Sequence, residues 1–322
     1  MTRVILMCTA IGLILGLGLV SGAFFRDMDR AHDRITGSST VIPSPYGDIE
    51  YSESGDGPAV LVCHGSGGGF DQGKLIAQML LGDEFRMIVP SRFGYLRSSL
   101  PESASFDDQA DAYVYLLDEL GLDQVAVLAF SHGGPSALLL AALHPDRVSS
   151  LTLVSCGVAS SSVEDQAQAN TQGAMLAAIF QRDLAYWSIT SIFRKQFLNL
   201  LGATDSVISD LSADQRRSID EFIDGMNPVS LRGPGAMFDN QAAMPNERIE
   251  AISAPTLVVH AVDDTLQIFD NAEYAAAMIP NAELLRFESG GHLVLLIEQE
   301  TVSAAVQEHI GEHLETSPVV NP

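Results

Sequence analysis

The stretch of residues 125–135, with the sequence VAVLAFSHGGP, decides how the rest of the chain is interpreted. Its first six residues are apolar and either small or β-branched for the most part, which is typical of a buried strand. After the paired glycines, residues 137–143 favour a helix. Ser131 therefore occupies a tight turn between a strand and a helix.

The turn at Ser131 has the features of a nucleophile elbow. Small residues, Ala129 and Gly133, stand two positions before and two positions after the serine, so the strand and the helix can approach each other. Such a turn strains the backbone and lifts the hydroxyl above the sheet, beside a helix N-terminus. The common pattern has glycine where this chain has Ala129. The alternative is an ordinary strand–loop–helix connection with a serine on the surface.

The composition indicates one large α/β domain with room for an inserted subdomain. The chain has 322 residues, of which 47% are hydrophobic and 18% are charged. Its formal net charge of −24 argues against nucleic acid as a partner, because phosphate would be repelled. The three cysteines match no metal-binding spacing. The sequence therefore predicts neither a metal site nor an organic cofactor.

The N-terminal region contains an uncharged run of 22 residues, 4–25. As a helix this run is about 33 Å long, which is enough to cross a bilayer. It therefore predicts a single membrane-spanning helix that anchors the protein in the membrane, followed by a polar linker at residues 26–39. The small residues 21–23 leave open a cleaved signal peptide and a secreted or periplasmic protein. Arginines flank both sides of the run, so the membrane side of the rest of the chain stays open.

Strands and helices alternate along most of the chain, which predicts a mainly parallel sheet of about eight strands with helices on both faces. Residues 157–248 interrupt this rhythm with helical, apolar sequence and no clear strand. We interpret them as an inserted helical cap, some of whose apolar residues line a pocket. The expected organisation is a membrane segment and linker at 1–39, the sheet domain at 40–156 and 249–322, and the cap at 157–248.

The residues that carry chemistry follow predicted strands. They are Ser131, the pair Asp263 and Asp264, His292, and the glycine-rich loop that begins at His64. In a parallel sheet the carboxyl ends of the strands share one edge, where ligands bind. A serine needs an adjacent base to become nucleophilic, and the base needs a carboxylate to orient it. The sequence therefore predicts a Ser-Asp-His triad, with either aspartate as the acid.

Each of these residues has an ordinary structural interpretation when it is taken alone. A loop histidine is often a hydrogen-bonded surface residue, and paired aspartates often form a turn. Their joint placement at strand ends favours the triad. We expect His64 to brace its loop, and His132 to contribute its backbone N–H rather than its ring.

With these motifs in hand, the chain resembles the α/β-hydrolase superfamily over residues 40–313. Residues 64–68 are similar to its HGxxG-type loop, residues 129–133 to its nucleophile motif, and residues 260–264 to its HGxxD acid loop. His292 matches the family's histidine loop. Residues 91–95 resemble a DxRGxG turn with serine in place of aspartate, and we assign them no catalytic role.

The resemblance implies a role for each site residue. Ser131 would be the nucleophile, Asp264 rather than Asp263 the acid, and His292 the base. Backbone N–H groups of Ser66 and His132 would form the oxyanion hole. The superfamily's haloalkane dehalogenases and epoxide hydrolases use aspartate as the nucleophile, so the serine disfavours both activities.

These expectations combine into a serine hydrolase, like a carboxylesterase, that cleaves an ester-type acyl bond of a small apolar molecule. A C–C bond hydrolase or a peptidase on the same triad is the alternative within enzymes. A non-catalytic protein that binds a small ligand is the alternative from another class. The sequence leaves the natural substrate and the oligomeric state open.

Overall fold

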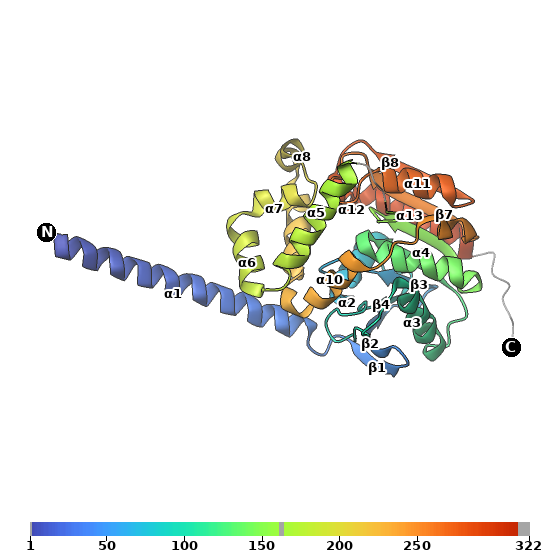
Figure 1. Cartoon of the computed structure of the whole chain (residues 1–322), viewed down its shortest axis with the longest axis horizontal. Helices are drawn as coiled ribbons and strands as arrows, with labels where there is room; N and C mark the ends of the chain where they lie inside the picture. The colour runs from blue at the N-terminus through green and yellow to red at the C-terminus, as the bar shows by residue number, and fades with distance from the viewer. Residues whose placement is uncertain (1, 161–163, 315–322) are drawn as a thin grey trace.

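The computed structural model describes residues 2–160 and 164–314, and it places side chains within these ranges except at 2–17, 164 and 165. Eight strands form one sheet, and short connections join most of them to helices (Figure 1). The strands are β1 (Thr40–Ser44), β2 (Gly47–Ser54), β3 (Ala59–Cys63), β4 (Arg86–Pro90), β5 (Val125–Phe130), β6 (Val148–Val154), β7 (Thr256–Ala261) and β8 (Ala282–Phe287).

The sheet is mainly parallel and has the order β1-β2-β4-β3-β5-β6-β7-β8. Only the pairs β1–β2 and β2–β4 are antiparallel. The five remaining pairs are parallel, so the carboxyl ends of six strands meet at one edge. The chain crosses from β4 past β3 to β5, which places β5 near the centre of the sheet. The predicted elbow follows β5 directly.

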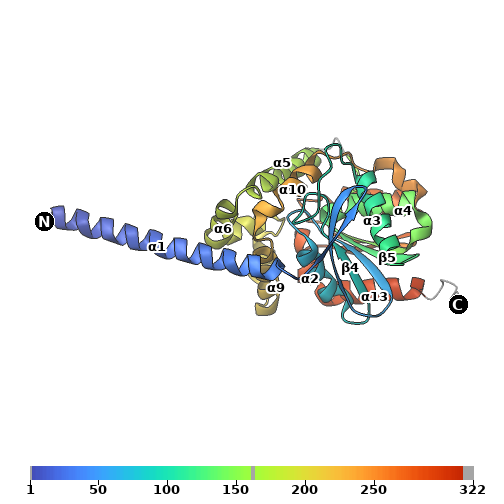
Figure 2. The ribbon, with the colours of Figure 1, turned by 90° about the horizontal axis from the view of Figure 1, so that it is seen from below.

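The two faces of the sheet are covered by different helices (Figure 2). Helices α2 (Phe70–Leu81) and α13 (Gln299–Leu314) pack on one face, and α3 (Phe106–Glu119), α4 (Gly134–Leu143) and α11 (Asp270–Met278) pack on the other. Alternate residues of a strand point to opposite faces. Val60 and Val62 therefore join one hydrophobic core, while Leu61 and Cys63 join the second.

Helices without a strand separate β6 from β7 among the described residues, and they lie over the carboxyl edge of the sheet (Figure 1). They are α5 (Glu164–Ile179), α6 (Asp183–Ile192), α7 (Arg194–Leu200), α8 (Asp205–Asp210), α9 (Ala213–Gly225) and α10 (Gly233–Gln241). The predicted fold class is thus confirmed, including the inserted helical cap. The cap sequence predicts helices near residues 167–181, 184–201 and 213–226. The second of these is divided at Phe193 into α6 and α7, and α8 and α10 lie outside all three.

The polar linker predicted at residues 26–39 is corrected by the N-terminal helix α1, which extends over Thr2–Ile35. Its last turns pack on the cap rather than crossing open solvent. Asp27 accepts a hydrogen bond from Trp187 at 3.1 Å, and the ring of Phe24 packs edge-on against the same indole. Arg34 donates to the carbonyl oxygens of Gly225 and Asn227. These contacts stabilise the last turns of α1, whose polar composition alone suggests a linker.

The predicted membrane-spanning run at residues 4–25 falls mostly outside the residues whose side chains are described, which begin at Gly18 on this helix. Within the described part of the chain, no helix has the length and apolar character needed to cross a membrane. The first part of α1 extends away from the body of the molecule (Figures 1 and 2).

Candidate active site

The elbow at the end of β5 is tight and strained. Ser131 has a φ of 52°, a left-handed conformation that is costly for a residue with a side chain. It begins a short turn that leads directly into α4. A Cβ added at Gly133 would lie 2.2 Å from the carbonyl oxygen of Cys63 on β3, so only glycine fits there. The close approach of this turn to the neighbouring strand end holds the serine hydroxyl at the sheet edge.

Ser131, His292 and Asp264 come together in one chain of hydrogen bonds. The Oγ of Ser131 lies 2.9 Å from the Nε2 of His292, and the Nδ1 of His292 lies 2.9 Å from an Oδ2 of Asp264. All three side chains are almost fully buried. A neutral imidazole donates from Nδ1 to the carboxylate and accepts at Nε2 from the hydroxyl. This geometry suits proton transfer from the serine to the histidine.

Asp264 is held in its ionised form. Its Oδ1 accepts hydrogen bonds from the backbone N–H groups of Leu266 and Gln267, both at 2.9 Å. Burial would raise the pKa of this carboxyl, but His292 and hydrogen bonds from His260 and His292 hold the pKa well below its usual range. The carboxylate is therefore fixed in position and charged at neutral pH.

The neighbouring Asp263 has a different partner. Its Oδ1 accepts a hydrogen bond of 2.8 Å from the backbone N–H of Gly291, immediately before His292. Asp263 therefore ties the loop after β7 to the loop after β8. Two adjacent aspartates thus support the same loop, Asp264 at the ring of His292 and Asp263 at the backbone of the preceding Gly291.

Ser66 and His132, the expected oxyanion donors, line the same cavity as Ser131. Ser66 belongs to the loop after β3, and His132 directly follows the serine in the elbow. The Nδ1 of the His132 ring lies 3.3 Å from the Nε2 of Gln267. The His132 ring thus has a hydrogen-bond partner other than His292.

A buried cluster around Arg92 and Asp239 was missed by sequence analysis. Arg92 follows β4, and Asp239 lies on α10 of the cap. Their side chains form a bidentate ion pair, with N–O distances of 2.6 and 2.7 Å, and neither side chain is exposed to solvent. The same carboxylate accepts hydrogen bonds of 2.5 Å from Ser66 and from Tyr95. This carboxylate of the cap therefore contacts the glycine-rich loop at Ser66.

Only one part of this cluster could be recognised in the sequence. The turn that contains Arg92 and Tyr95 resembled a family motif, but Asp239 lies in a segment that matched none. Burial would raise the pKa of Asp239, and the Arg92 guanidinium holds that pKa below its usual range instead. Because the two charges compensate each other, the ion pair can remain buried.

His64 braces the glycine-rich loop, as expected. Its Nδ1 lies 2.8 Å from the carbonyl oxygen of Gly65, and its Nε2 accepts a hydrogen bond of 2.9 Å from the backbone N–H of Arg92. One nitrogen donates and the other accepts, which requires a neutral ring. Burial, together with the Arg92 charge, lowers the pKa of His64 to about 3.

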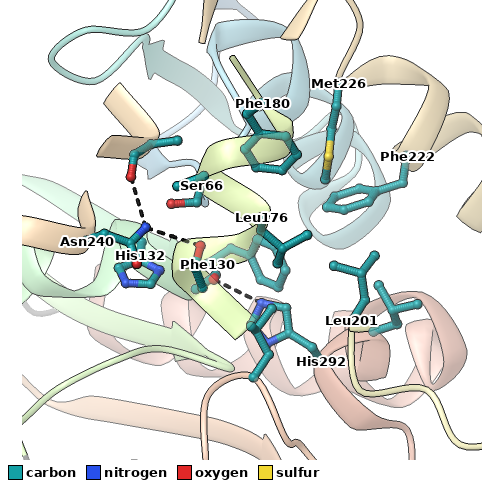
Figure 3. Close-up of a pocket in the computed structure, with 16 residues that line it drawn as sticks. Ser66, Phe130, His132, Leu176, Phe180, Leu201, Phe222, Met226, Asn240 and His292 are labelled. Atoms are coloured by element: carbon teal, nitrogen blue, oxygen red, sulfur yellow. Dashed lines mark hydrogen bonds between the residues drawn. The ribbon is translucent and has the colours of Figure 1, made fainter. Parts of the chain in front are cut away.

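A small apolar cavity of about 40 Å³ adjoins Ser131 (Figure 3). Cap side chains form much of its wall, including Leu176, Phe180, Phe222 and Met226. These residues come from α5, α9 and the turn that follows each of them. The cavity thus lies between the carboxyl edge of the sheet and the cap.

A second cavity of about 420 Å³ adjoins the first and is more polar. Amide side chains of Gln166, Asn170 and Gln267 line it. Gly173 and Asn240 belong to both cavities. A substrate that occupies both would therefore have a small apolar part and a polar part. Among the described residues, no cluster of three or more histidine, cysteine or acidic side chains is arranged to hold a metal ion.

Fold and site together define a hydrolase of the α/β class, with a serine at a nucleophile elbow. Comparison with known proteins agrees with this class. The model of the alpha/beta hydrolase fold family matches residues 58–299, and the chain therefore belongs to that family.

Relatives and solved structures are similar over most of the chain. An uncharacterized hydrolase, YcgS, of Bacillus subtilis is 29% identical over 271 residues, which are 81% of this chain and 93% of that protein. A 2-hydroxy-6-oxononadienedioate/2-hydroxy-6-oxononatrienedioate hydrolase of Cupriavidus pinatubonensis is 26% identical over 80% of this chain and 89% of its own length. An alpha/beta hydrolase fold protein of Nakamurella multipartita superposes with a TM-score of 0.64 at 27% identity, covering 85% of this chain and 99% of that one.

Proposed function

We propose that the protein is a serine hydrolase that cleaves an ester-type acyl bond of a small molecule with an apolar acyl group. The observation that carries this proposal is the buried hydrogen-bond chain from Ser131 through His292 to Asp264. It combines a nucleophile, a base and an orienting carboxylate at a strained elbow. The apolar cavity beside the serine supports the choice of acyl group.

The mechanism follows from the positions of these groups. The Oγ of Ser131 attacks the carbonyl carbon while its proton passes to the Nε2 of His292. Backbone N–H groups of Ser66 and His132 stabilise the negative charge that develops on the carbonyl oxygen. His292 then returns the proton to the leaving oxygen, and an acyl-enzyme remains. Water, activated by the same histidine, releases the acid and restores the serine.

A C–C bond hydrolase is the second candidate, because a relative acts on a dienedioate, which is a dicarboxylate by name. Such a substrate calls for cationic partners. Among the described residues that line the apolar cavity and its polar neighbour, none is an arginine or a lysine. Arg92 lies nearby but is already paired with Asp239. An uncharged ester therefore suits this site better.

A fluorophosphonate probe tests the proposed chemistry. We expect it to modify Ser131 alone, as located by peptide mass spectrometry, and to leave the S131A variant unlabelled. The wild-type protein should hydrolyse p-nitrophenyl acetate or butyrate, and S131A should not. Absence of labelling in the folded wild-type protein would favour a non-catalytic ligand-binding protein instead. Labelling with cleavage of a C–C substrate but of no ester would favour the second candidate.

We also propose that α1 anchors the protein in a membrane, on the strength of the uncharged run at residues 4–25. The contacts of α1 with the cap begin at Phe24, near the end of that run. The anchored protein should stay in the membrane pellet after alkaline carbonate washing and be released by detergent. If the mature protein instead begins at Phe24 and needs no detergent, the segment is a cleaved signal peptide.

A further inference from the structure

One aromatic side chain lies between the cavity at Ser131 and a larger groove beside the end of α1. The groove has a volume of about 550 Å³ and lies between α2, α9 and the end of α1. Phe70 and Leu75 form apolar parts of its wall, and Arg34 lines it from α1. Among the described residues, Phe222 of α9 is the one side chain that lines both the groove and the catalytic cavity.

Phe222 is held firmly in this dividing position. Its exposed fraction is only 2%, although cavities lie on two sides of it. Its ring packs edge-on against Phe130, with 5.8 Å between ring centroids. Phe130 in turn lies 5.1 Å from the imidazole of His292. The dividing ring therefore rests on the residue that precedes the catalytic serine.

The catalytic cavity is small compared with the space behind this ring. A single water needs on the order of 10–15 Å³ of such volume, so about 40 Å³ accommodates an acyl group of only a few atoms. Away from the polar second cavity, on the side where Phe222 forms the wall, a longer apolar chain must either displace this ring or stop at it. Figure 3 shows Phe222 and Met226 projecting toward the same cavity. Met226 lines the cavity but not the groove, so the two side chains differ in what lies behind them.

We propose that Phe222 sets the upper length of the acyl chain, so that the enzyme acts on esters of short-chain apolar acids. The inference rests on the proposed ester hydrolysis. Removing the ring joins the cavity to the groove, where a longer chain lies against Phe70 and Leu75. Removing Met226 enlarges the cavity without opening it.

The experiment compares wild-type protein, F222A and M226A on p-nitrophenyl acetate, butyrate, octanoate and dodecanoate. In the wild type, kcat/KM should fall at least about tenfold from butyrate to octanoate, because the added methylenes have no space. In F222A, kcat/KM for octanoate and dodecanoate should rise at least about tenfold over wild type. For M226A, kcat/KM should rise on butyrate and stay low on dodecanoate. F222L, which keeps more of the packing, should give an intermediate limit, and circular dichroism establishes that each variant is folded.

Two further arms separate this inference from the proposed function. Alkylphosphonate inhibitors of increasing alkyl length report on the cavity without ester turnover, and F222A should react faster than wild type with the long ones alone. Equal length dependence in wild type and F222A would overturn the inference while leaving the serine hydrolase intact. Alkyl acetates of increasing alcohol length test the other part of the substrate. If F222A had a higher kcat/KM than wild type on long alkyl acetates but not on esters of long acyl chains, the cavity would hold the alcohol and the inference would be wrong. Failure of every phosphonate to react would overturn the proposed function itself.

Discussion

The carboxyl edge of the sheet and the cap above it form two walls of the same cavity, but different forces shape them. At the sheet edge, each functional group has a fixed hydrogen-bond partner, as Ser131, His292 and Asp264 show. In the cap, the lining groups are apolar side chains held by packing, such as Phe222 and Met226. Under the proposed function, the edge accounts for the chemistry and the cap determines which molecule reaches it.

Substitutions at the two walls should therefore have separable effects on catalysis and on substrate selectivity. Changes at the edge should lower the rate for every substrate alike. Changes in the cap should reorder the substrates and leave the chemical step competent. Asp239 is the exception, because it belongs to the cap and contacts the edge through Ser66.

The largest effect is expected for D264N. An amide in place of the carboxylate cannot hold the imidazole in the required tautomer or stabilise its charged form, so kcat should fall roughly 10³- to 10⁴-fold for all substrates. The matched control is D263N, whose side-chain oxygen can still accept from Gly291 and should cost less than about tenfold. Steady-state kinetics on a short ester measure both. A greater loss in D263N would show that the other aspartate is the acid.

The next effect is expected for D239N, which weakens the contact of this cap carboxylate with Ser66 of the glycine-rich loop. The amide cannot satisfy Arg92, Tyr95 and Ser66 together, and the loop that presents the Ser66 N–H should shift. We expect kcat to fall about 10- to 100-fold, within the range for a weakened oxyanion donor, with a smaller change in KM. Thermal unfolding of the variant should also begin earlier, because Arg92 becomes a buried charge without a full partner.

S66A is the control for D239N. It removes the hydroxyl that donates to Asp239 but keeps the backbone N–H and the ion pair with Arg92. Its stability should stay close to that of the wild type, and its loss in kcat should be smaller than that of D239N. If folded D239N kept kcat within about twofold of wild type, the cap would have no influence on the chemical step.

The sheet edge could be predicted from the sequence because its residues follow local rules. An apolar strand, small residues around Ser131 and polar residues after later strands are each visible within a few positions. Parallel strand ends then bring Asp264 and His292 to one place. The eight strands and the cap were predicted for the same reason, since their patterns are short-range.

The parts that sequence analysis missed depend on contacts between distant segments. Asp239 meets Arg92 across 147 positions of sequence, and no local pattern marks it. The end of α1 is polar, yet Asp27 and Arg34 find partners on the cap. Helix α10 begins with Gly233, Pro234 and Gly235; the two glycines disfavour a helix by composition alone, whereas proline is tolerated in a first turn. Which cap side chains reach the cavity is likewise a property of packing.

The smallest effect is expected from His64, and it appears in stability rather than in activity. Burial lowers the pKa of His64 to about 3 in the folded protein, whereas an unfolded histidine titrates near 6.5. Above pH 6.5 the ring is neutral in both states, and its contribution to stability is fully present. As the pH falls below 6.5, the unfolded chain takes up a proton that the folded protein does not, so stability is lost progressively toward pH 3. Between pH 7 and pH 5 this one group should cost about 2 kcal/mol.

Urea unfolding of wild type and H64N at pH 7 and pH 5 measures this contribution. Asparagine carries an NH2 group that donates and a carbonyl oxygen that accepts, so it preserves part of the contact with Gly65 and Arg92 but does not titrate. H64N should be less stable than wild type at pH 7, yet lose about 2 kcal/mol less on acidification. The comparison between the two proteins cancels the other groups that titrate in this range. An equal loss in both would mean that His64 is protonated in the folded protein, and the loop of Ser66 would then be braced by a charge rather than by a neutral ring.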